Sequence, residues 1–78
     1  MSRRKQTPPP TEAAAFSIAS FCTAHHLSES FYYKMRTEGW GPDEMQVGAR
    51  VLISFEAAAR WRAAREKEAR KRLERVAK

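Results

Sequence analysis

Few side chains in this 78-residue sequence have the types and spacing that catalysis requires. Cys22 is the single cysteine, and His25 and His26 are adjacent, so a helix would point the two imidazoles away from any shared metal ion. No serine, histidine and aspartate stand in a context that builds a pocket, and glycine-rich phosphate loops are absent. We therefore expect no enzymatic activity, no metal site and no cofactor, with Cys22 and both histidines serving as packing or helix-end residues.

The charge pattern points instead towards binding. The formal net charge is +6, and Arg3, Arg4 and Lys5 form a basic cluster near the start. Residues 6–64 hold five basic and six acidic side chains, whereas residues 65–78 hold seven basic and three acidic ones. The excess therefore lies at the two ends, which suits either arms that contact nucleic acid or simply solvated tails.

Length and composition predict one small domain in the cytoplasm. A single cysteine allows no internal disulfide, which favours a reducing compartment. No apolar run approaches the roughly 20 residues of a membrane span, and no hydrophobic stretch follows the basic N-terminus as in a signal peptide. Residues 1–15, with three consecutive prolines, are expected to form a disordered basic arm.

Two short helices are predicted after this arm. Ser17 is suited to cap the first, which carries apolar side chains at one-face spacing and ends near His26. Leu27 is a turn residue expected to point inward, and Ser28 caps the second helix through about Glu38. Gly39 follows as a C-terminal stop. The apolar positions of the two helices are Ile18, Phe21, Cys22 and His25 in the first, and Phe31, Tyr32 and Met35 in the second.

A β-hairpin is predicted next, with two possible registers. A two-residue loop, Gly48-Ala49, would place Arg50 and Leu52 on the face of Met45 and Val47. A three-residue loop would instead gather four apolar side chains, Met45, Val47, Val51 and Ile53, on one face. Because one face of a sheet is normally buried, we favour the longer loop, with Arg50 at its exposed tip.

The last predicted helix is capped by Ser54 and anchored by Trp61, with Glu56 at the positive end of its dipole. Residues 66–78 continue as strong helix formers with opposite charges four residues apart. Their thin apolar stripe is too short for a coiled coil, which needs three or four heptads. We expect a charged, solvated helical extension.

The order of these parts resembles the excisionase/AlpA group of phage and mobile-element DNA-binding proteins. The resemblance covers about residues 16–65 and rests on the Ser17-Ile18 start, the segment from Leu27 to Arg36 followed by Gly39, the Val47-to-Ser54 wing, and Trp61. It implies a MerR-like winged helix-turn-helix, mainly α-helical with a small β-hairpin.

The resemblance also implies which residues contact DNA. The second helix would enter the major groove, with Lys34 and Arg36 reaching phosphates or a guanine edge. Arg50 on the wing would enter the minor groove or hold the backbone. Glu29 departs from the group, where a basic residue is frequent. The implied contacts are Ser28, Glu29, Ser30, Tyr33, Lys34, Arg36, Thr37 and Arg50, together with Arg3, Arg4 and Lys5 in the arm.

Three functions follow from these observations. The first is a recombination directionality factor that binds repeated sites cooperatively, bends double-stranded DNA and directs an integrase to excision. The second is an AlpA-like transcriptional regulator with the same fold. The third, of another class, is a small helical module whose basic end binds an acidic protein or RNA.

Overall fold

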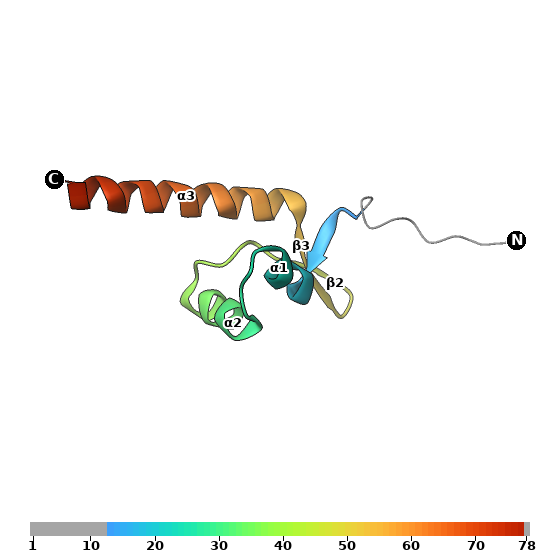
Figure 1. Cartoon of the computed structure of the whole chain (residues 1–78). Coiled ribbons are helices and arrows are strands. Elements are labelled where there is room, and N and C mark those ends of the chain that lie inside the picture. Colours follow the sequence, from blue (N-terminus) through green and yellow to red (C-terminus); the bar gives the residue numbers. More distant parts are fainter. Residues whose placement is uncertain (1–12, 78) are drawn as a thin grey trace, which may run out of the picture.

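Three helices and one three-stranded antiparallel sheet make up the part of the chain that the computed structural model describes, residues 13–77 (Figure 1). In chain order these are β1 (Ala15–Ser17), α1 (Ile18–Ala24), α2 (Glu29–Glu38), β2 (Met45–Val47), β3 (Arg50–Ser54) and α3 (Phe55–Ala77). Within this range no helix is both long and apolar enough to cross a membrane. The basic cluster Arg3, Arg4 and Lys5, and most of the predicted arm, lie outside the described residues.

Helix α1 begins and ends at local hydrogen bonds that its sequence supplies. As predicted, Ser17 is the N-cap: its side chain accepts from the backbone N–H of Ser20, whose hydroxyl lies 2.9 Å from the Ser17 nitrogen. At the other end, the Leu27 N–H donates to the Cys22 carbonyl at 2.9 Å while His26 takes a left-handed φ of 59°. This pattern matches a Schellman motif and turns Leu27 inward against the core, as expected.

Helix α2 has the predicted bounds. The Ser28 hydroxyl accepts from the Phe31 N–H at 3.1 Å, and Gly39 ends the helix with a left-handed φ of 88°. Tyr32 and Met35 are fully buried, but Phe31 is 38% exposed, so the three apolar positions of this helix do not form one buried face. Phe31 lies about 100° around the helix axis from Tyr32. It packs edge-on against Trp40, with 5.8 Å between ring centroids.

The sheet has the order β1-β3-β2. Its hairpin has the register with the two-residue loop, and not the three-residue loop that the sequence favours. Val47 pairs with Arg50, so the loop is Gly48-Ala49. Gly48 has a φ of 63° and Ala49 does not have a positive one, as in a type II′ turn. The prediction that Met45, Val47, Val51 and Ile53 share one face of the sheet is therefore wrong.

The reason for this register is that β2 extends past the core. Met45 and Val47 are 41% and 53% exposed, so burial does not select their face, and the turn does. On the core face of the sheet, Ile53 is paired with Phe16 of β1. The sequence pattern does not predict β1, because Ala15 and Ser17 become a strand only by pairing with β3.

Helix α3 starts directly after β3 and closes the core. Ser54 caps it as predicted, its hydroxyl accepting from the Ala57 N–H at 2.9 Å. Trp61 packs against Phe21 with 5.3 Å between centroids but is only partly buried. The buried hydrophobic core consists of Phe21, Cys22, Tyr32, Met35, Ile53, Ala57 and Ala58, and Pro42 in the linker after α2 is buried as well.

Candidate functional site

A row of exposed side chains follows the outer surface of α2. Because Tyr32 and Met35 are buried, residues 100° or more away around the helix must face solvent. This places Ser30, Tyr33, Lys34 and Thr37 in one row, which we call the outer row of α2, with Glu29 at its edge. All six predicted contact residues of this helix, and Ser28 at its cap, are exposed: Ser28, Glu29, Ser30, Tyr33, Lys34, Arg36 and Thr37.

Arg36 differs from the outer row in what it contacts. It lies near the buried side of α2, and its guanidinium is 3.1 Å from a carboxylate oxygen of Glu44. It also lies 5.9 Å from the ring centroid of Tyr33. Lys34, in contrast, is 62% exposed and reaches only Glu38, at 3.9 Å. Such an exposed pair is weak, so Lys34 is available to another anion, whereas the half-exposed Arg36 is paired with a mostly buried carboxylate.

Glu44 is the residue of this region that the sequence did not single out. Besides Arg36, it accepts a hydrogen bond from the hydroxyl of buried Tyr32. Burial, and then this hydrogen bond, raises the pKa of Tyr32 above its ordinary value. Glu44 stands twelve residues after Tyr32, in the linker before β2, and no periodic pattern relates positions so far apart.

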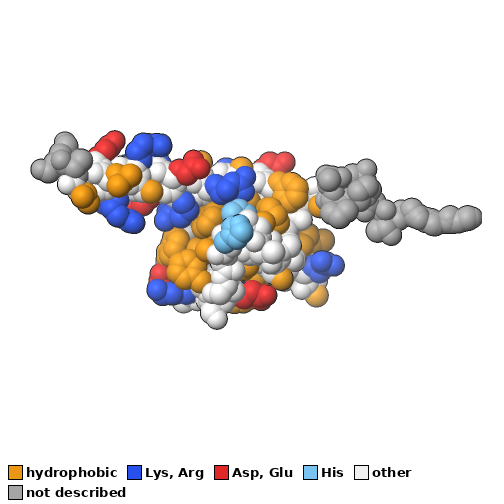
Figure 2. Space-filling model, viewed as in Figure 1, with side chains coloured by type: hydrophobic (Ala, Val, Ile, Leu, Met, Phe, Trp, Pro, Cys, Tyr) orange, Lys and Arg blue, Asp and Glu red, His pale blue; other side chains and the backbone are white. Residues whose placement is uncertain are grey.

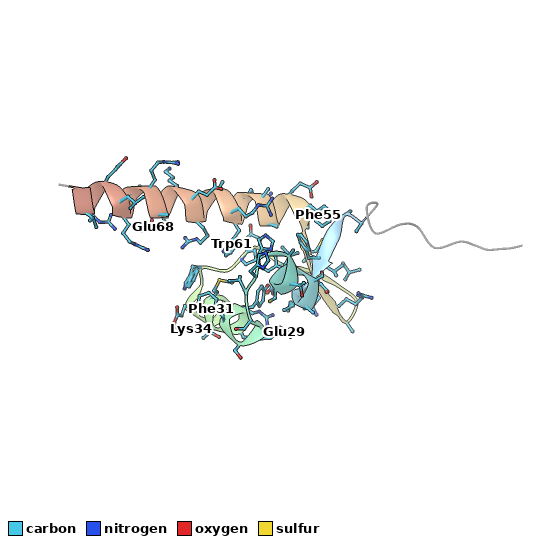
Figure 3. All side chains as sticks on the ribbon, in the orientation of Figure 1. Glu29, Phe31, Lys34, Phe55, Trp61 and Glu68 are labelled. Atoms are coloured by element: carbon cyan, nitrogen blue, oxygen red, sulfur yellow. The ribbon has the colours of Figure 1, made fainter. Side chains whose placement is uncertain are left out.

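Arg50 occupies the wing, the hairpin formed by β2 and β3. It closes the turn opposite Val47 and is exposed, with its side chain on the sheet face that also carries Met45 and Val47. The wing tip and α2 both lie on the side of the molecule away from α3 (Figure 1). Figure 3 shows Glu29 and Lys34 on that same side. Lys34 of the outer row and the wing therefore lie on the same side of the molecule, away from α3.

Two of the groups that could do chemistry, Cys22 and His25, are committed to packing. Cys22 is 2% exposed, and burial, with a smaller effect from Glu29, raises the pKa of its thiol. His25 stacks on Phe21 at 4.1 Å and has its Nδ1 2.8 Å from the Phe21 carbonyl oxygen, so this nitrogen carries the proton. Within residues 13–77, no three histidine, cysteine or acidic side chains are grouped to hold a metal ion.

A hollow of about 330 Å³ lies between α3 and the linker that follows α2. Trp40 and Trp61 line it, and the Trp61 indole N–H donates to the Trp40 carbonyl at 2.9 Å. Arg60 and Asp43 pair at 3.5 Å beside it. None of the residues lining this hollow has a hydroxyl, thiol or imidazole, and its one carboxylate, Asp43, is paired with Arg60.

Comparison of the chain with protein-family models, with curated proteins and with solved structures finds no match in any of the three.

Proposed function

We propose that this protein is a sequence-specific binder of double-stranded DNA with a winged helix-turn-helix fold. In this proposal α1 and α2 form the helix-turn-helix, α2 is the recognition helix, and β2 and β3 are the wing. The observation that carries the proposal is the outer row of α2, which is exposed and lies, like the wing, on the side of the molecule away from α3. An α-helix presented in this way fits the major groove while the adjacent hairpin reaches the neighbouring groove or backbone.

Each exposed residue has a role in this proposal. Tyr33 and Lys34 lie in the middle of the outer row and would contact bases or phosphates. Ser30 and Thr37 would supply neutral hydrogen bonds at its two ends. Arg50 would contact the minor groove or its phosphates. Arg36 stays paired with Glu44 and orients Tyr33, so its contribution to DNA affinity is small.

The charges of this surface suggest how affinity and specificity are divided. The described surface carries two basic side chains, Lys34 and Arg50, and two acidic ones, Glu29 and Glu38. Because these charges balance, its electrostatic attraction to phosphates is modest. Glu29 at the start of α2 would disfavour phosphate and could accept from a cytosine amino group. The basic cluster at residues 3–5 would add the salt-sensitive part of the affinity.

The finer role that we propose is that of an excisionase, a recombination directionality factor acting in the cytoplasm on a mobile element. It would bind adjacent sites cooperatively, bend the DNA and position an integrase for excision. Support comes from the resemblance of residues 16–65 to the excisionase/AlpA group. The same surface would serve a transcriptional regulator, so the arrangement of sites on DNA separates the two roles.

Footprinting of the DNA that flanks the encoding gene tests this proposal. Several adjacent, cooperatively filled sites at one end of an integrated element are expected. A single protected operator over a promoter would replace excision with transcriptional regulation. Absence of protection at low salt, where phosphate contacts are strongest, would overturn DNA binding itself.

A further inference from the structure

The second half of α3 extends beyond the domain without a partner. Trp61, Arg62 and Arg65 hold the first part of α3 against the rest of the fold. Trp61 donates to the Trp40 carbonyl, Arg62 lies 3.1 Å from His25 Nε2, and Arg65 lies 5.1 Å from the Trp40 ring centroid. Residues 66–77 continue for about 18 Å past this point. Figure 1 shows this half projecting away from the sheet and past α2. Within the described residues, nothing covers it.

This projecting half is amphipathic. Ala69, Leu73 and Val76 follow at i, i+4 and i+7, which places them on one face that we call the α3 stripe. Leu73 is 69% and Val76 is 77% exposed. Helical geometry places Arg65 and Arg72 along one edge of the stripe, and Glu66 and Arg70 along the other. Figure 2 shows hydrophobic and basic side chains side by side on this half.

The charges at the edges argue against a second copy of the chain as the occupant. In a parallel pair, Arg65 of one copy would face Arg70 of the other. In an antiparallel pair, Arg65 would face Arg72. Either arrangement places like charges beside a short apolar seam, which disfavours association.

The apolar stripe and its place in the fold argue against DNA as the occupant. The exposed Leu73 and Val76 would gain little from a phosphate backbone. In addition, α3 lies on the side of the molecule opposite Glu29 and Lys34 (Figure 3). A duplex held by the outer row of α2 would therefore not reach the α3 stripe.

We propose that the α3 stripe is a docking surface for an acidic amphipathic helix of a partner protein. The apolar face of that helix would cover Ala69, Leu73 and Val76. Its glutamate or aspartate side chains would pair with Arg65, Arg70 and Arg72, the arrangement that sets partner choice in paired helices. This surface is separate from the outer row of α2, so both can be occupied at once.

Two synthetic helical peptides test the proposal with the full chain. Both carry leucine and isoleucine at heptad core positions, and the flanking positions are glutamate in one and lysine in the other. Fluorescence anisotropy of the labelled peptides is expected to show at least tenfold tighter binding of the acidic one. Equal affinity for the two peptides, or no binding of the acidic one, would overturn the proposal.

A pair of double variants separates docking from simple charge attraction. Leu73→Gln with Val76→Gln removes the stripe and keeps helix propensity, and at least a tenfold loss of acidic-peptide affinity is expected. Lys71→Gln with Arg75→Gln removes two charges from the opposite face and should change affinity less than threefold. Circular dichroism checks that α3 remains helical in both. If the second pair weakens binding more than the first, the stripe is not the site.

Charge reversal and sedimentation complete the test. Arg70→Glu with Arg72→Glu is expected to shift the preference to the basic peptide. Sedimentation of the wild-type chain should give a monomer. A dimer that Leu73→Gln with Val76→Gln dissociates would identify a second copy as the occupant and overturn the proposal. The proposal would also be overturned if the wild-type chain bound a random-sequence duplex and the variant Leu73→Gln with Val76→Gln did not.

Discussion

The hydroxyl of buried Tyr32 donates a hydrogen bond to Glu44, whose other carboxylate oxygen lies 3.1 Å from Arg36. This contact joins the inner side of α2 to the linker that leads into β2. Together with the burial of Tyr32 and Met35, it holds the inner side of α2 against the rest of the fold. Glu44 thus supports the candidate surface without being part of it.

Arg36 and Lys34 should respond differently to truncation. Arg36→Ala leaves Glu44, which is only partly exposed, without its cation and should lower the free energy of unfolding by about 1 kcal/mol. Lys34→Ala removes only an exposed pair and should change stability by less than about 0.5 kcal/mol while weakening DNA binding. Urea titrations and duplex-binding isotherms of the two variants measure both effects. Equal loss of stability in the two would contradict the assignment.

Stability should fall at high pH because of Tyr32. Burial and the bond to Glu44 raise the pKa of Tyr32 above its ordinary 10.0, so the folded chain keeps a proton that the unfolded chain loses. The corresponding stabilisation is complete below about pH 10 and decreases as the pH rises further. Unfolding midpoints measured from about pH 8 to about pH 11 should show this decline.

Two phenylalanine variants isolate the Tyr32 contribution. Tyr32→Phe should cost about 1–2 kcal/mol at neutral pH and flatten the decline above pH 10. Exposed Tyr33→Phe serves as the control and should leave the pH profile unchanged. A wild-type profile that Tyr32→Phe does not alter would show that other groups cause the decline.

Trp61 has two separable roles in stability. Its ring packs on Phe21, and its N–H donates to the Trp40 carbonyl at 2.9 Å. Trp61→Phe should lose mainly the hydrogen bond, about 1 kcal/mol, whereas Trp61→Ala should cost about 3 kcal/mol, at the low end for tryptophan because the ring is only partly buried. Thermal melts followed by circular dichroism compare them. Equal effects would assign the whole contribution to the hydrogen bond.

His26 is strained in the turn between α1 and α2. Its φ of 59° is a left-handed conformation that a residue with a Cβ adopts at a cost. His26→Gly should relieve that cost and raise the free energy of unfolding by about 0.5–1 kcal/mol after the greater entropy of unfolded glycine is subtracted. Gly39→Ala, with its φ of 88° and open space for a Cβ, should have the opposite sign. Destabilisation by His26→Gly would place an unrecognised contact at that side chain.

Local signals predicted most of the helical part from the sequence alone. Ser17, Ser28 and Ser54 cap helices because each side chain meets an amide three residues later, which depends on neighbours only. The wing register was mispredicted because burial was assumed for Met45 and Val47, and only the tertiary fold shows that β2 extends past the core. Strand β1 also escapes prediction, because Ala15 and Ser17 become a strand only by pairing with β3.

The candidate surface could be predicted only in part. The exposed residues of α2 follow from its apolar spacing, so their orientation was available from the sequence. The pairing of Arg36 with Glu44 was not, because the linker of residues 40–44 has no periodicity that would bring Glu44 beside α2. The sequence therefore treats Arg36 and Lys34 alike, whereas the fold gives them different ion-pair partners.

Selection of DNA from a random duplex library by the full chain tests the central claim most directly. The wild type should enrich one defined sequence at low salt. The triple variant Ser30→Ala, Tyr33→Ala and Lys34→Ala should remain folded and enrich nothing or a different sequence. No enrichment by the wild type, or the same enriched sequence with the triple variant, would contradict the proposal that the outer row of α2 reads DNA.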